Sequence, residues 1–147
     1  MSRRLSLQEE FPNALIVERL QLTFTVRFAM HEGVCQTLEG PVAYQPGTAL
    51  ITGYKGEQWP VEAPTFLTTY APVNNDIMGK DGLYERLPQR LMACKLNAPM
   101  DVVLGDNRGV LHGRTSDWLV EHPSGSRAIV AADIFPTYYR IIGSKEA

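Results

Sequence analysis

Apolar and polar residues alternate along an early stretch of the chain, and this alternation predicts a β-strand. The apolar members of the stretch are Leu20, Leu22, Phe24, Val26 and Phe28. Successive side chains of a strand point to opposite faces, so a period of two places these five side chains on one face. The other face carries polar side chains.

Residues that favour turns divide the following stretch into two hairpins and a short helix. Glu39–Gly40 marks the turn of the first hairpin and Gly53–Gly56 that of the second, and Pro46–Gly47 suits a type II turn between them. The expected strands are residues 34–38, 41–44, 49–52 and 58–61. Phe66 and Tyr70 then lie four residues apart, as on one face of a helix.

The chain also contains an internal repeat, because residues 50–70 align without a gap on residues 119–139. The identical pairs are Leu50 and Leu119, Gly56 and Gly125, Val61 and Val130, Ala63 and Ala132, Phe66 and Phe135, Thr68 and Thr137, and Tyr70 and Tyr139. A period of about seventy residues is too long for a solenoid and suits a duplicated small domain. In the second copy we expect Asp133 to cap the helix that carries Phe135 and Tyr139.

The repeat extends upstream if Pro88 is treated as an added residue, since residues 18–21 resemble residues 85–89. Arg27 and Phe28 then align with Lys95 and Leu96. This alignment predicts that the buried face of the second strand carries Met92, Cys94 and Leu96.

The expected fold is mainly β, or α+β at most, built from two tandem pseudo-repeats. Each repeat is a small antiparallel β-roll or half-open barrel of four to five strands, closed by a short helix. The expected boundaries are an N-terminal extension at 1–16, a first repeat at 17–73, a linker at 74–82, a second repeat at 83–143 and a tail at 144–147. Ser6 and Glu9 are spaced as a capping box for a short helix in the extension. The two repeats are expected to pack about a pseudo-twofold axis, because a unit of this size has a marginal core alone.

Composition narrows the class of protein. The hydrophobic fraction of 44% and the charged fraction of 20% are those of a folded domain, and the net charge of -2 makes nucleic acid an unlikely partner. No stretch is long and apolar enough for a signal peptide or a membrane span. Cys35 and Cys94 are expected to be two free thiols in a cytoplasmic protein, and no metal site or cofactor is predicted.

Two stretches resemble a known family. Thr37-Leu38-Glu39-Gly40, Pro46-Gly47, Lys55-Gly56-Glu57, Trp59-Pro60-Val61, Phe66 and Thr69-Tyr70 form the first, and Ser116-Asp117-Trp118-Leu119-Val120 with Phe135 and Tyr139 the second. Both are similar to the uncharacterised PGDYG protein family and to related small bacterial and phage-encoded proteins, so the pattern is present twice. The chain departs from it in having Thr48 in place of Asp and Ser116 in place of Gly. The resemblance implies a prokaryotic or phage setting and transfers no catalytic residue.

No motif in the sequence identifies a reaction, so we expect a non-enzymatic binding module that holds a small ligand or a protein partner between the repeats. The candidate ligand-binding residues are Arg27, Glu57, Trp59, Asp117, Trp118 and Arg127. The aromatic residues among them could anchor a ligand, and the arginines suit an anionic one. The alternatives are a small hydrolase that uses His112 or His122 with Asp117, and a phage structural or assembly protein. A homodimer is also compatible with the sequence.

Overall fold

A computed structural model describes residues 7–73, 77–123 and 125–144. Its elements are mostly antiparallel strands with a few short helices, so the prediction of a mainly β fold is confirmed. The chain divides into two compact units made of interleaved segments. Unit 1 contains residues 1–20, 88–102 and 111–147, and unit 2 contains residues 21–87 and 103–110.

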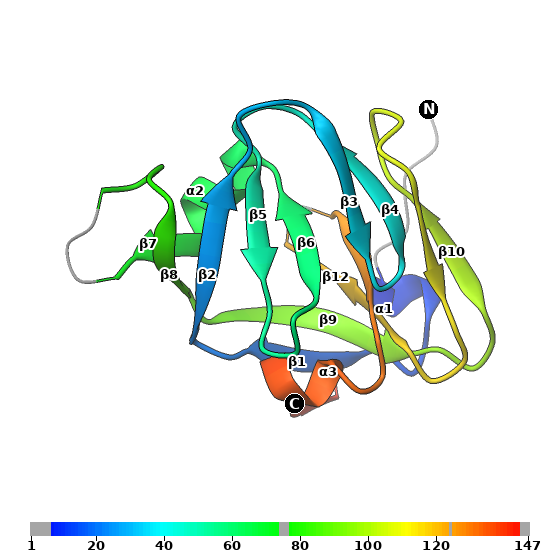
Figure 1. Ribbon diagram of the computed structural model, residues 1–147. Coiled ribbons are helices and arrows are strands. Elements are labelled where there is room, and N and C mark those ends of the chain that lie inside the picture. The colour runs from blue at the N-terminus through cyan, green and yellow to red at the C-terminus, as the bar shows by residue number, and fades with distance from the viewer. Residues whose placement is uncertain (1–6, 74–76, 124, 145–147) are drawn as a thin grey trace. The chain divides into compact units, whose positions relative to one another are not determined.

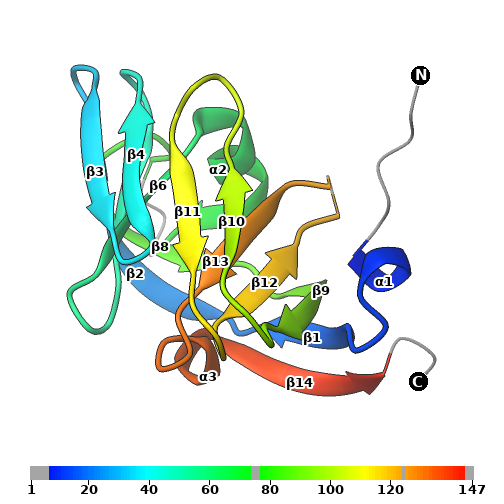
Figure 2. The same cartoon turned by 90° about the vertical axis from the view of Figure 1, so that its right-hand side faces the viewer.

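Unit 1 is built on a five-stranded sheet with the order β13-β12-β9-β1-β14, whose strands can be followed in Figure 2. Its strands are β1 (Leu15–Arg19), β9 (Gln89–Lys95), β12 (Trp118–Glu121), β13 (Arg127–Val130) and β14 (Tyr139–Ser144). A helix, α1 (Leu7–Glu10), precedes β1, and α3 (Phe135–Tyr138) leads into β14. Leu7 is completely buried, so α1 contributes to the core of this unit.

Unit 2 is built on a second five-stranded sheet, with the order β6-β5-β2-β8-β7 (Figure 1). Its strands are β2 (Leu22–Phe28), β5 (Ala49–Thr52), β6 (Gln58–Val61), β7 (Tyr70–Pro72) and β8 (Gly82–Arg86). The helix α2 (Ala63–Thr69) joins β6 to β7, and β3 (Gly33–Thr37) pairs with β4 (Gly40–Tyr44) in a separate hairpin. A further hairpin, β10 (Met100–Val103) with β11 (Val110–Gly113), has its tip, residues 103–110, in unit 2.

The alternation predicted for the early strand is confirmed. Phe24 and Val26 of β2 are almost completely buried, whereas Thr25 and Arg27 between and beside them are exposed. The two hairpins predicted from turn residues are also present, as β3–β4 and β5–β6.

The prediction for the buried face of the second strand is confirmed at Cys94 and Leu96 and is wrong at Met92. Leu91 and Ala93 are buried, whereas Met92 is only half-buried. Leu87 and Pro88 connect β8 to β9, so Pro88 belongs to the connection and adds no residue to the strand. Cys94 is buried as well, because β9 is the central strand of its sheet.

The two aromatic residues of each predicted pair are in contact, but the prediction that both lie on one helix is wrong, because Tyr70 and Tyr139 have extended backbone. The rings of Phe66 and Tyr70 stack at 4.6 Å, and those of Phe135 and Tyr139 stack at 4.8 Å. Each tyrosine is the first residue of the strand that follows its helix. These rings anchor the end of each helix to its sheet.

Two capping predictions have different outcomes. The N-cap residue of α3 is Ile134, and no side chain caps this helix, so the prediction of Asp133 as the cap is wrong. The chain turns into the helix one residue later than the sequence pattern indicated. Ser6, the predicted cap of the N-terminal helix, lies outside the described residues.

The strand pairing crosses the linker expected at residues 74–82. β1 pairs with β9 and β14, while β8 pairs with β2 and β7, so each sheet takes one strand from the other side of this linker. Residues 74–76 of the linker lie outside the described part. Each sheet is open, with β13 and β14 or β6 and β7 at its edges, and neither closes into a barrel. No helix among the described residues has the length and apolar character needed to cross a membrane.

Candidate functional site

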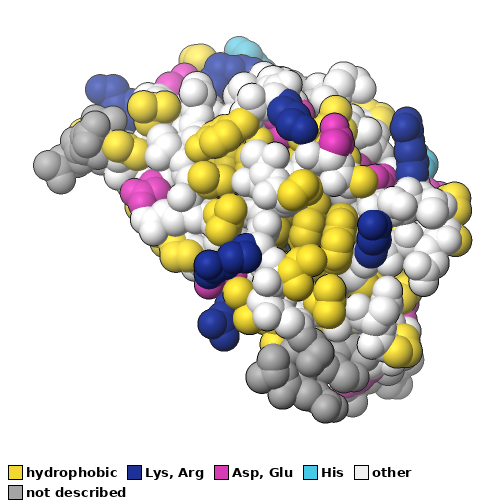
Figure 3. Space-filling model, turned by 90° about the horizontal axis from the view of Figure 1, so that it is seen from below, with side chains coloured by type: hydrophobic (Ala, Val, Ile, Leu, Met, Phe, Trp, Pro, Cys, Tyr) yellow, Lys and Arg dark blue, Asp and Glu magenta, His cyan; other side chains and the backbone are white. Residues whose placement is uncertain are grey.

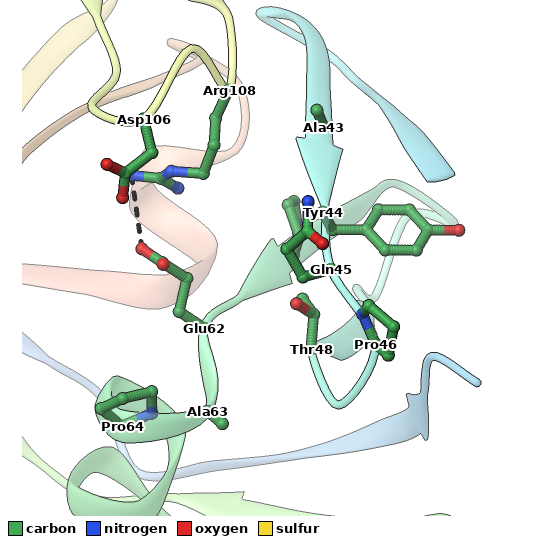
Figure 4. Close-up of a pocket in the computed structure, with 11 residues that line it drawn as sticks. Ala43, Tyr44, Gln45, Pro46, Thr48, Glu62, Ala63, Pro64, Asp106 and Arg108 are labelled. Atoms are coloured by element: carbon green, nitrogen blue, oxygen red, sulfur yellow. Dashed lines mark ion pairs between the residues drawn. The ribbon is translucent and has the colours of Figure 1, made fainter. Parts of the chain in front are cut away.

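A pocket of about 270 Å³ lies within unit 2 (Figure 4). It is lined by Ala43, Tyr44, Gln45, Pro46, Thr48, Pro60, Glu62, Ala63, Pro64, Asp106 and Arg108. These residues come from the end of β4, the turn before β5, the end of β6, the start of α2 and the tip of the β10–β11 hairpin. The pocket therefore collects groups from three parts of the sequence that are far apart.

The turn between β4 and β5 forms one wall of the pocket. Gly47 has φ of +88°, which glycine adopts without steric strain, and the N–H of Gly47 donates to the carbonyl oxygen of Ala29. The N–H of Thr48 donates to the carbonyl oxygen of Gln45. These bonds hold Gln45 and Thr48 at the pocket.

The tip of the β10–β11 hairpin is held beside β4. The N–H of Ala43 donates to the carbonyl oxygen of Arg108 at 2.8 Å. Gly109 has φ of +138°, and a Cβ at this position would meet the carbonyl oxygen of Pro41. Only glycine permits this close approach, and the approach places Arg108 on the pocket wall.

An ion pair joins two walls of the pocket. The Nη2 atom of Arg108 lies 3.4 Å from Oε1 of Glu62, as the dashed line in Figure 4 marks. The side chain of Glu62 is 52% exposed, so water screens this pair and its contribution to stability is small. Both charged groups therefore remain accessible to a ligand.

Thr48 is a polar residue in an enclosed position at the pocket. It is only 5% exposed, and among the described residues its hydroxyl group has no hydrogen-bond partner. In the described part of the chain, the buried side-chain atoms that lack a partner are found on Arg19 and Arg86, so the hydroxyl oxygen of Thr48 is still accessible, and it is an available donor and acceptor for a ligand in the pocket.

The six predicted ligand-binding residues divide between the two units, and none of them lines this pocket. In unit 2, Arg27 is exposed on β2, Glu57 is half-buried in the β5–β6 turn, and the ring of Trp59 meets Phe24 edge to face at 5.6 Å. Trp59 therefore contributes to packing.

The other three predicted residues, in unit 1, have structural contacts. The carboxylate of Asp117 accepts hydrogen bonds from the N–H groups of Arg114 and Ala132, each at 2.9 Å. The ring of Trp118 stacks on Phe135 at 4.0 Å. Arg127 donates to Glu121 and to Glu10, each at 2.9 Å, so its charge is balanced within the unit.

The alternative prediction of a hydrolase paired His112 or His122 with Asp117, but both histidines contact other residues. Nδ1 of His112 lies 2.8 Å from Oδ1 of Asp101, and both side chains are more than 60% exposed. Nδ1 of His122 lies 3.0 Å from Nη2 of Arg19. The carboxylate of Asp117 accepts from backbone N–H groups, and it contacts neither imidazole.

Both cysteines are free thiols, as predicted, and both are buried. Burial raises the pKa of Cys94 to about 11 and also raises the pKa of Cys35. A thiol of this kind remains protonated at neutral pH and is a poor nucleophile. Among the described residues no group of three or more His, Cys, Asp or Glu side chains is arranged to hold a metal ion.

Two arginines are buried in the sheets. Arg19 at the end of β1 is 6% exposed, and Arg86 at the end of β8 is 4% exposed. Nη1 of Arg19 lies 3.4 Å from Oε1 of Gln89, and the guanidinium of Arg86 lies 5.0 Å from the ring centroid of Phe24. Both arginines therefore pack in the core of their units.

Several large hydrophobic side chains are exposed, including Val34 in unit 2 and Ile141 in unit 1. Figure 3 shows one face of the molecule, on which hydrophobic side chains lie in groups with Lys and Arg side chains beside them. Exposed apolar side chains are common on protein surfaces, so their presence does not mark an interface.

Sequence reasoning missed most of the pocket. Residues 105–109 lie in the turn between β10 and β11, and nothing in the sequence indicates that Arg108 in this turn lies beside Glu62. One signal was available at Thr48, which differs from the aspartate of the family pattern.

Comparisons with known proteins identify the family. The family model described as PGDYG protein matches residues 40–140. The chain belongs to the PGDYG protein family, as the resemblance predicted. No curated protein and no solved structure matches the chain.

Proposed function

We propose that this protein is a non-enzymatic binding module and that the pocket of unit 2 holds its small ligand. The observation that carries this proposal is the unpaired hydroxyl of Thr48 at a pocket that also presents Arg108 and Glu62. A concave site with a few converging polar groups is typical of small-molecule recognition.

The contacts of the reactive side chains support binding over catalysis. Asp117 is occupied by backbone N–H groups, and burial keeps the thiol of Cys94 protonated. His112 lies beside Asp101 and His122 beside Arg19, and neither histidine is among the residues that line the pocket. The free thiols also support a cytoplasmic location, where cysteines stay reduced.

We also propose that the two sheets descend from one duplicated unit. The first strands of the two copies, β1 and β8, have been exchanged, so that each lies in the sheet of the other copy. In chain order, β1 corresponds to β8, β2 to β9, β5 to β12, β6 to β13 and β7 to β14. When each strand is replaced by its counterpart, the order β13-β12-β9-β1-β14 becomes β6-β5-β2-β8-β7. Arg19 of β1 is opposite Tyr139, and Arg86 of β8 is opposite Tyr70. An experimental structure in which these two pairs have different registers would contradict the proposed duplication.

The binding proposal is tested by a screen of small metabolites against the ¹⁵N-labelled protein. We expect ligands to shift the amide signals of pocket residues such as Gln45, Ala63 and Arg108, while the signals of exposed residues on β2, such as Thr25, stay unchanged. The matched variant is Arg108→Gln, which removes the charge at the pocket wall and should weaken charged ligands. A screen in which no compound shifts the pocket signals would contradict a ligand site here.

A further inference from the structure

Building on the binding function proposed above, we infer that the pocket of unit 2 takes the carboxylate group of a small ligand. The chain carries an internal precedent for this contact in unit 1. There, Asp117 supplies a carboxylate at a turn that has the same backbone hydrogen bonds as the turn at Thr48.

The turn at Asp117 shows how backbone N–H groups bind a carboxylate. Its Oδ2 atom accepts from the N–H of Arg114 and its Oδ1 atom from the N–H of Ala132. The backbone N–H of Asp117 donates to the carbonyl oxygen of Arg114, and the N–H of Leu96 donates to the carbonyl oxygen of Asp117. The carboxylate thus joins the turn before β12 to the segment after β13.

The backbone at Thr48 follows the same pattern. The N–H of Thr48 donates to the carbonyl oxygen of Gln45, three residues earlier, and the N–H of Ala29 donates to the carbonyl oxygen of Thr48. The preceding residue has a positive φ at both turns, +88° at Gly47 and +80° at Ser116.

The strand register also identifies the counterpart of the second donor to Asp117, the N–H of Ala132. Ala49, which follows Thr48, pairs with Val61, and Trp118, which follows Asp117, pairs with Val130. Ala63 and Ala132 each come two residues after the paired valine. The N–H groups of Gln45 and Ala63 are therefore the counterparts of those that bind Asp117.

Thr48 has no carboxylate to offer these donors. Across residues 7–73, 77–123 and 125–144, no hydrogen bond is formed by the N–H of Gln45, the N–H of Ala63 or the hydroxyl of Thr48. All three residues line the pocket, and Figure 4 shows Thr48 below Gln45, with the segment that begins at Glu62 to their left. A carboxylate placed there would accept from all three, and hydrogen bonds to a charged acceptor are the stronger kind.

The charges around the pocket restrict the ligand further. Arg108 favours an anionic group, whereas Glu62 and Asp106 favour a cationic one. A ligand that carries both a carboxylate and an ammonium group satisfies both requirements. A small amino acid is therefore expected to bind more tightly than a simple carboxylic acid of the same size.

Three probes of similar size separate these contributions in an NMR titration of the full-length protein. Alanine carries both charges, propionate carries the carboxylate alone, and propionamide carries neither. We expect alanine and propionate to shift the amide signals of Gln45 and Ala63, with alanine binding more tightly, and propionamide to leave them unchanged. Equal binding of propionate and propionamide would overturn the inference.

Replacement of the threonine supplies the matched variants. Thr48→Asp provides an internal carboxylate for the same donors, so we expect it to weaken alanine binding by about tenfold or more without lowering the melting temperature. Thr25→Asp adds the same charge on an exposed part of β2 and should leave binding unchanged. Thr48→Val keeps the volume but removes the hydroxyl, and should weaken binding less than Thr48→Asp. Unchanged affinity in Thr48→Asp would contradict the inference.

The outcomes also separate this inference from the binding function itself. If uncharged metabolites from the screen shift the pocket signals while alanine and propionate do not, the carboxylate assignment is overturned and the binding function stands. If neither the screen nor the acids shift these signals, both are overturned.

Discussion

The guanidinium of Arg19 lies 3.0 Å from the imidazole of His122, measured from Nη2 to Nδ1, in a partly buried contact within unit 1. Arginine only donates, so Nδ1 of His122 must be the acceptor in this contact. The Nε atom of Arg19 is buried without a hydrogen-bond partner, which leaves this arginine dependent on its remaining contacts.

Replacement of His122 by alanine is therefore expected to destabilise the protein by about 1–3 kcal/mol, because it removes an acceptor from a buried cation. Urea unfolding followed by tryptophan fluorescence measures the change. The control is His112→Ala, since His112 is exposed and should contribute less than about 0.5 kcal/mol. Equal effects of the two substitutions would contradict a structural role for the contact at Arg19.

Asp117 is expected to be required for stability. Asp117→Ala leaves the N–H groups of Arg114 and Ala132 without their acceptor, and should cost about 1–3 kcal/mol. Asp101→Ala is the control, because Asp101 is exposed and paired with His112. Thermal unfolding of both variants decides the point, and a melting temperature of Asp117→Ala close to that of Asp101→Ala would count against this role.

Backbone strain at Ser116 predicts a substitution that raises stability, whereas the substitutions above lower it. Its φ of +80° is unfavourable for a residue with a Cβ, so Ser116→Gly should raise stability by about 0.5–1 kcal/mol. Gly47→Ala introduces the same strain at φ of +88°, where a Cβ would meet no atom within 4 Å, so it should lower stability by a similar amount. Differential scanning calorimetry of the two variants measures both changes. Shifts of the same sign in both variants would contradict this account.

Stability should fall in alkaline solution because of Cys94. Burial raises the pKa of this thiol from 9.0 to about 11, so the unfolded chain loses the proton at a lower pH than the folded one. Between these two values the folded state binds more protons, and stability therefore decreases as the pH rises through this range. Urea unfolding between pH 8 and about 10 measures the slope. Cys94→Ala should show a shallower slope, and an identical slope would contradict the assignment.

Local patterns in the sequence predicted much of the secondary structure. The alternation from Leu22 to Phe28 sets the buried face of β2, and Gly56, which has a positive φ, lies in the turn of the β5–β6 hairpin that turn chemistry indicated. The spacing of Phe66 and Tyr70 indicated that their side chains share one side, and the rings do stack, although Tyr70 begins β7 and is not part of α2. These features depend on interactions between residues close in sequence, so a short window of sequence contains the information.

Only the tertiary structure decided which strands pair and where the pocket lies. Two residues, Leu20 and Gln21, connect β1 to β2, a length typical of a hairpin, yet β1 pairs with β9 and β14 instead. The position of Arg108 beside Glu62 likewise depends on a bond from Ala43 to a hairpin more than sixty residues further along the chain. Such pairings are selected by the packing of the whole fold, and the local pattern of apolar and polar residues is compatible with several of them.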